Sequence, residues 1–181
     1  VDSFEVSYGD PQTVAVLARR ELRGLVLRYS INGRRPQTTG TRLWRGGERY
    51  GDEGTTYYGE FRGQVRGARP GDRVRVWFEA YRPGKGRASA KGRPGGKRTS
   101  SRSFTYRLVQ DTRDKVVVIA GEDYDGVNPT YDPPLTAPKY AQTYARALRA
   151  AGIGASVWDV SRQGVPHHLG VLSHFRGAVW Y

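Results

Sequence analysis

The sequence predicts two domains: an all-β sandwich over residues 1–110, then the first half of a Rossmann-like α/β domain over residues 111–181. In the first part apolar and polar residues alternate with period two, as in strands with one buried face. At 116–120 five apolar residues run without interruption, which predicts a strand covered on both faces. The positive charge also divides there, with 23 basic and 10 acidic side chains in residues 1–110 and 7 of each in residues 111–181.

The first part contains about seven segments in which apolar and polar residues alternate, and no segment of useful length shows the hydrophobic period of a helix. Asn32-Gly33 predicts a tight hairpin because both residues tolerate positive φ, and Pro70-Gly71-Asp72 predicts a turn. About seven short strands in about 100 residues are typical of an immunoglobulin-like or fibronectin type III-like sandwich. The expected strands lie at 4–8, 14–16, 25–31, 57–61, 74–80 and 104–108, with an ill-defined one at 38–45.

A basic segment at 82–102 lies between two expected strands and therefore predicts a long hairpin loop. One interpretation is a weak polyanion-binding arm that acts through counterion release; the other is a solvated insertion. No aromatic residue lies between Tyr81 and Phe104, so the segment offers no stacking platform for bases. The possible polyanion contacts are Arg82, Lys85, Arg87, Lys91, Arg93, Lys97, Arg98 and Arg102.

Aromatic residues are frequent in the expected sandwich. On the outside of such a fold they bind sugars or peptides. As cross-strand pairs or core residues they serve stability, and we favour this interpretation. The residues in question are Trp44, Tyr50, Tyr57, Tyr58 and Trp77.

In the second part three acids, Glu122, Asp123 and Asp125, follow the buried strand. Ligands of open α/β sheets collect at the carboxyl ends of strands, so these acids form a possible ligand loop. The loop has no Gly-rich phosphate motif, and the ligand Glu of a calcium loop is missing. The alternative, a solvated turn with capping acids, is favoured.

After this loop the pattern predicts a helix that begins at Thr136-Ala137-Pro138 and ends at Gly152. A second strand at 155–160, a short helix at 166–174 and a third strand at 178–181 follow. Parallel strands joined by a right-handed crossover are the expected arrangement. The pattern is that of the first half of a flavodoxin-like or amidotransferase-like sheet.

No catalytic, metal-binding or cofactor-binding residue is predicted in this chain. None of the three His residues has an acid within three positions, so no zinc-binding HxxE or HExxH motif can be drawn. The chain has no Cys, which excludes thiolate ligands and a Cys nucleophile within it. No apolar run is long enough to span a membrane.

Three blocks, 44–54 (WRGGERYGDEG), 118–129 (VIAGEDYDGVNP) and 164–175 (GVPHHLGVLSHF), carry a resemblance. They are similar to the segment after the catalytic domain in large secreted zinc carboxypeptidase-like proteins of actinobacteria. The resemblance implies a secreted parent that acts on peptides or proteins, with its zinc and catalytic residues upstream of Val1. The parent's peptidase domain would then be the partner of this segment.

Three functions follow as hypotheses. The leading one is a non-catalytic accessory region of a secreted zinc metallocarboxypeptidase-like protein, which spaces, docks or binds substrate. The second is a polyanion-binding module that uses segment 82–102, and the third is an α/β enzyme completed beyond Tyr181. Because the chain begins at Val1 without Met and ends within an apparent strand, we expect an internal fragment of a longer protein.

Overall fold

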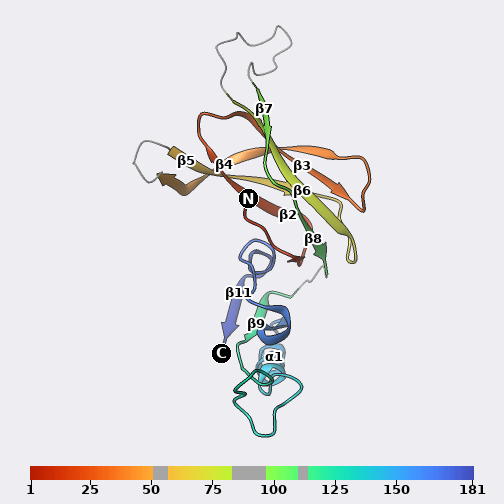
Figure 1. Ribbon diagram of the computed structural model, residues 1–181. Helices are drawn as coiled ribbons and strands as arrows, with labels where there is room; N and C mark the ends of the chain where they lie inside the picture. The colour runs from red at the N-terminus through yellow and green to blue at the C-terminus, as the bar shows by residue number, and fades with distance from the viewer. Residues whose placement is uncertain (51–56, 83–96, 110–113) are drawn as a thin grey trace. The chain divides into compact units, whose positions relative to one another are not determined.

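The computed structural model describes residues 1–50, 57–82, 97–109 and 114–181, which form two compact units, Val1–Gln110 and Asp111–Tyr181 (Figure 1). The first unit holds an eight-stranded sheet and the second a three-stranded sheet. The longest helix described has 10 residues, a length of about 15 Å. None of the described helices has the length and apolar character needed to cross a bilayer.

The strands of the first unit are connected in a single path. Their order is β1-β8-β6-β3-β4-β5-β2, with β7 beside β6. Only the β1–β8 pair is parallel among the described strands of this unit. The bounds are Val6–Ser7 (β1), Gln12–Arg19 (β2), Arg23–Ile31 (β3), Gln37–Tyr50 (β4), Tyr57–Val65 (β5), Arg73–Tyr81 (β6), Arg98–Ser100 (β7) and Phe104–Leu108 (β8).

Strand β4 joins the two parts of this sheet. Its first residues, Gln37–Gly40, pair with β3, whereas Thr41 and the residues after it pair with β5. One strand of 14 residues therefore belongs to both parts. The predicted immunoglobulin-like or fibronectin type III-like sandwich of two separate sheets is wrong for this reason, since the sheet bends along β4 instead of being divided.

The two ends of the strand path come close together. The Asp2 N–H donates a hydrogen bond to the carbonyl of Ala15 on β2 (3.1 Å), and the Ser7 hydroxyl at the end of β1 contacts the side-chain carbonyl of Gln12 at the start of β2. The sheet is thus nearly closed and resembles a barrel. Closure removes most exposed strand edges, which would otherwise pair with other chains.

The core of the first unit follows the period-two pattern that the sequence shows. Alternate residues of β6 and β8 are buried while their neighbours are exposed or half-buried, and this prediction is confirmed there. In β3 the alternation holds up to Tyr29, after which Ser30 and Ile31 are both buried. The Tyr106 ring is almost fully buried, and burial raises the pKa of its hydroxyl. The fully buried set includes Leu27, Val74, Val76, Phe78, Tyr106 and Leu108.

Between β5 and β3 the interior of the bent sheet leaves no room for a side chain at Gly63. A Cβ built on Gly63 would lie 2.8 Å from the Cβ of Leu27, a distance that no real pair of side chains adopts. Gly59, on the same face of β5, would meet the Leu43 Cδ1 at 2.7 Å. Leu43 is 36% exposed, so the end of its side chain can move aside. The absence of a side chain at Gly63 therefore allows β5 to lie close to Leu27 of β3.

We expect Gly63→Ala to lower the free energy of unfolding by about 1–3 kcal/mol, the usual effect of overpacking a core. The Leu27 Cβ is fixed to the backbone of β3, which faces β5 across the bend, and cannot rotate away. Gly59→Ala is the matched control and should change stability less, because only a flexible Leu43 methyl must shift. Urea unfolding of both variants measures the difference, and an equal effect would contradict this account of the sheet.

The second unit has three parallel strands in the order β10-β9-β11. Val117 and Val118 point to opposite faces of β9, and both are buried, so the prediction of a doubly covered strand is confirmed. Val118 packs with Ala145 of α1 and Ala155 of β10. The bounds are Val116–Ala120 (β9), Ala141–Ala150 (α1), Ala155–Asp159 (β10), Val160–Gln163 (α2), Leu172–His174 (a 3-10 turn) and Gly177–Trp180 (β11).

The Rossmann-like prediction for this unit is nevertheless wrong. In the described residues, strands dominate the chain, and only α1 is a helix of more than four residues. Helix α1 begins at Ala141, later than the predicted start at Thr136, and the predicted helix at 166–174 is reduced to the 3-10 turn. Residues 121–140 form no regular element, because four prolines there lack the N–H that a helix needs. They are Pro129, Pro133, Pro134 and Pro138.

Candidate functional site

The carboxyl edge of the parallel sheet holds the acids that the sequence selected. Glu122 comes two residues after β9. Its carboxylate accepts hydrogen bonds from the N–H groups of Lys139 (2.8 Å) and Tyr140 (3.0 Å). Tyr140 is the N-cap of α1 and has no side-chain cap of its own. Glu122 therefore caps α1 from a distant part of the chain and satisfies N–H groups that a helix leaves unpaired.

These contacts set the protonation of Glu122. Burial by itself raises the pKa of the carboxyl, but the donors at Lys139 and Tyr140 lower it, and the net pKa lies below the usual value. The Tyr131 hydroxyl adds a weaker hydrogen bond at 3.3 Å. Glu122 is thus held as a carboxylate by the helix that it caps.

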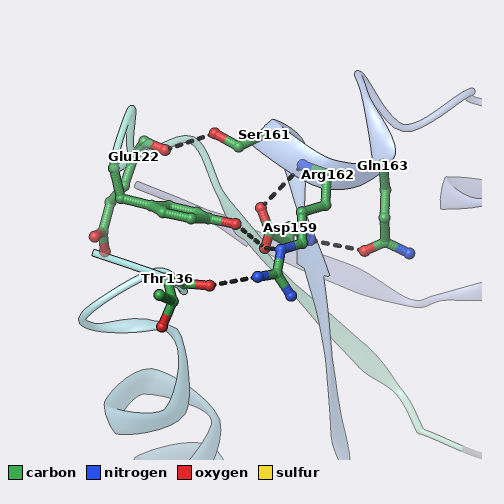
Figure 2. Close-up of polar contacts among 7 residues, drawn as sticks. Glu122, Thr136, Asp159, Ser161, Arg162 and Gln163 are labelled. Atoms are coloured by element: carbon green, nitrogen blue, oxygen red, sulfur yellow. Dashed lines mark hydrogen bonds and ion pairs between the residues drawn. The ribbon is translucent and has the colours of Figure 1, made fainter. Parts of the chain in front are cut away.

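The next strand ends in a second structural acid, Asp159. It accepts a hydrogen bond from the Tyr124 hydroxyl at 2.6 Å and another from the Arg162 N–H at 3.3 Å, which caps the short helix α2 (Figure 2). Tyr124 is fully buried. Burial, together with the Asp159 carboxylate, raises the pKa of Tyr124 to about 12, so the phenol donates its proton to this hydrogen bond at neutral pH.

Two further contacts tie the irregular segment 121–140 to α2. The Ser161 hydroxyl donates to the Glu122 carbonyl at 3.2 Å, and the Arg162 guanidinium donates to the Thr136 carbonyl at 2.5 Å (Figure 2). Sequence reasoning missed Tyr124, Asp159 and Arg162. An Asp at the end of a strand, followed by a polar segment, is an N-cap signal that could have indicated Asp159.

The other two acids of the predicted ligand loop do not converge on Glu122. The Asp123 carboxylate accepts from the Gly126 N–H at 2.9 Å, which closes a local turn, and Asp125 is exposed. Taken one unit at a time, the described residues bring no three potential metal ligands together. The His167 Nδ1 accepts from the N–H groups of Leu169 and Gly170 (3.2 Å each), as expected for a capping His.

Half of the predicted polyanion contacts can be placed. Arg98 on β7 forms an ion pair with Glu79 on β6 at 2.5 Å, and the Trp77 indole donates to the same carboxylate at 3.0 Å. Arg82, Lys97 and Arg102 are exposed. The remaining four, Lys85, Arg87, Lys91 and Arg93, lie outside the described residues.

The aromatic residues of the first unit differ in exposure. Trp77 and Tyr57 are half-buried, and the Arg20 guanidinium lies 4.4 Å from the Tyr57 ring centre, in keeping with the cross-strand role that we favoured. Tyr58 is half-buried as well, and the side chain of Tyr50 lies outside the described residues. Trp44 is the exception, because it is 50% exposed.

Comparisons with known proteins give little. No protein-family model matches the chain, and no curated protein matches it. Among solved structures it is similar to the crystal structure of a bromine derivative of BhCBM56, a carbohydrate-binding module. The TM-score is 0.32 and the identity 13%, over 56% of this chain and 86% of that chain.

The structure corrects two predictions from the sequence, the Rossmann-like fold of the second part and the assignment of the chain to a peptidase. Over the residues that the structure describes, the chain is mostly β and forms no Rossmann-like domain. Nothing in the described residues or in the comparisons supports the label of peptidase for this chain, since the acids at its best candidate edge are used as helix caps. The resemblance that suggested the label rested on blocks of sequence without catalytic motifs.

We expect Glu122→Gln to lower the free energy of unfolding at neutral pH by about 1–2 kcal/mol, the usual contribution of a helix cap. Because the folded pKa of Glu122 is depressed, its contribution is present above the unfolded pKa of about 4.3 and is lost as pH falls through the folded value. The difference between wild type and variant should therefore shrink in acid.

Thermal unfolding from pH 7 to pH 3, with hydrogen exchange at the Lys139 and Tyr140 amides, measures this effect. Asp125→Asn is the control, because it removes the same charge from an exposed position of the same loop. If both variants lose equal stability, or if the two amides keep their protection in Glu122→Gln, Glu122 does not cap α1.

Proposed function

We propose that this chain is a non-catalytic accessory region of a larger secreted protein. The observation that carries the proposal is the use of the two carboxylates at the sheet edge. Glu122 is engaged by two backbone N–H groups, and Asp159 by a phenol and a backbone N–H. A general acid or base must exchange its proton with a substrate within hydrogen-bond reach, and these contacts occupy the oxygens that would do so.

The nature of the parent stays a prediction. Its secretion, its zinc-dependent metallocarboxypeptidase-like character and its peptide or protein substrate rest on the resemblance of blocks 44–54, 118–129 and 164–175. No part of that prediction assigns a zinc ligand or a catalytic residue to the present chain. Under this proposal the chain spaces or docks the parent's peptidase domain, or binds its substrate.

The purified chain, incubated with equimolar zinc and peptides that carry free C-termini, should release no amino acids. After dialysis it should retain well under one zinc ion per chain, measured by elemental analysis. The reason is the engagement of Glu122 and Asp159 in capping. Turnover that Glu122→Gln abolishes, while folding persists by circular dichroism, would overturn the proposal.

A second candidate function is weak binding of anionic polymers by the first unit. The observation that favours it is the charge, because the net +13 of the chain lies entirely within residues 1–110. Arg82, Lys97 and Arg102 add exposed positive charge at the ends of segment 82–102. A field of this kind attracts polyanions without sequence preference, through release of their counterions.

Removal of three of these charges, in Arg82→Ala/Lys97→Ala/Arg102→Ala, should shift elution from a heparin column to lower salt. Lys115→Ala/Arg146→Ala/Arg176→Ala is the matched control, since it removes three exposed charges from the second unit, whose net charge is 0. The control should shift elution less. Equal shifts would show that net charge alone, and not this segment, governs the attraction.

A further inference from the structure

The outer face of β2, β4 and β5 carries a groove of about 760 Å³ that none of the functions above uses. Arg42 on β4 and Arg62 on β5 are directly opposite in the antiparallel ladder. Trp44 lies two residues further along the same face, and Gln64 is opposite Thr13 of β2. The residues that matter for the argument are Thr13, Arg42, Trp44, Arg62, Gln64 and Arg66.

Trp44 and Arg62 form the centre of the groove. The Arg62 guanidinium lies 3.7 Å from the centre of the Trp44 ring, and its Nε donates to Glu60 at 2.6 Å. The side chain of Arg62 is only 23% exposed. Arg62 is therefore held between an aromatic ring and a carboxylate, with its Nη groups not used by that ion pair. Trp44 keeps half of its surface in solvent, an unusual exposure for the largest apolar side chain.

The charge of the groove points to an anion. Its described lining includes three arginines. Glu60, which lies opposite Trp44 on the same face and pairs with Arg62, offsets only one of these charges. Like charges directly opposite in an antiparallel sheet are destabilising, so the Arg42–Arg62 pair reduces the stability of the empty fold. The pair alone is not enough, because Arg73 and Arg107 are also opposite each other on β6 and β8. What distinguishes the groove is the exposed Trp44 beside its arginines.

The other tryptophan of the first unit lacks this combination. Trp77 also lines a hollow with three arginines, Arg34, Arg73 and Arg75. Its indole N–H is engaged by Glu79 at 3.0 Å, and the ring is half-buried with guanidinium groups at 6.0 Å (Arg28) and 5.9 Å (Arg75) from its centre. Trp77 therefore belongs to the packing of the outer face.

We propose that the groove on β2, β4 and β5 binds an acidic oligosaccharide, with a sugar ring against Trp44 and its carboxylate or sulfate groups on Arg42 and Arg62. The C–H face of a sugar packs on an aromatic ring, and the guanidinium fork binds planar oxyanions with two parallel hydrogen bonds. Gln64 and Thr13 offer amide and hydroxyl groups for sugar hydroxyls. One exposed tryptophan gives no platform for the successive bases of a nucleic acid.

The proposal narrows the second candidate function to a site and a ligand class, but it uses no residue of segment 82–102. An experiment can therefore contradict the groove proposal without contradicting the polyanion-binding role of segment 82–102, and the reverse. The triple variant of Arg82, Lys97 and Arg102 should leave the groove's affinity for a short acidic oligosaccharide unchanged within about twofold, since such a ligand has too few charges for distant contacts to matter beyond a screening length.

The test is a calorimetric titration of the full chain with hexasaccharides of polygalacturonate and of heparin, which separate carboxylate from sulfate recognition. A neutral cellohexaose and a six-base single-stranded DNA are the comparison ligands. We expect one or both acidic sugars to bind and the other two ligands to bind at least about tenfold more weakly. Arg42→Ala/Arg62→Ala should weaken binding about tenfold or more, as loss of charge-assisted hydrogen bonds does. Trp44→Ala removes the ring on which the sugar packs and should also weaken binding about tenfold.

Arg73→Ala/Arg107→Ala is the matched control, because it removes the other cross-strand arginine pair and the same charge. It should weaken binding less than about threefold. A second measurement needs no disruptive variant: during titration of the unmodified chain, the Trp44 indole N–H signal should shift while that of Trp77 does not, with Trp44→Phe giving the assignment. The proposal would be overturned if the two double variants lost affinity equally. It would also be overturned if cellohexaose or DNA bound as tightly as the acidic sugars, or if the Trp44 signal did not shift.

Discussion

The double pairing of β4 is the interaction on which the first unit depends. Because Gln37–Gly40 pair with β3 and the residues from Thr41 pair with β5, one continuous ladder connects strands that a sandwich would divide between two sheets. The bend brings β5 against β3, and Gly63 permits that approach. It also gives β2, β4 and β5 a common outer face. The groove with Trp44 and its arginines exists only because these three strands are neighbours.

In the second unit the constraint is different, because the N-cap residue of α1, Tyr140, makes no side-chain capping hydrogen bond. A long irregular segment separates β9 from α1, so the helix start cannot be held by the preceding residues. Glu122, which follows β9, holds it through the N–H groups of Lys139 and Tyr140. Asp159, the last residue of β10, holds the irregular segment through Tyr124, and Arg162 donates to the Thr136 carbonyl. Acids at the carboxyl edge of a parallel sheet indicate a ligand site in many α/β proteins. Here the same position serves to anchor the chain.

The two units therefore use their charged residues in opposite ways. In the second unit acidic and basic residues are equal in number, and Glu122 and Asp159 are engaged in internal hydrogen bonds. In the first unit arginines outnumber the acids that could pair with them, and several remain exposed on strand faces. An excess of this kind contributes little to stability, since surface charges are well solvated. Its effect is on what the surface attracts.

Local structure could be predicted from the sequence, because period-two alternation and an uninterrupted apolar run are properties of single segments. The strands around Leu27, Val76 and Tyr106, the buried strand at Val117 and Val118, and the helix end at Gly152 belong to this class. The closure of the sheet and the partners of Glu122 could not be predicted. Each depends on residues far apart in the chain, and only the tertiary structure decides which distant N–H group, strand or guanidinium a given side chain meets.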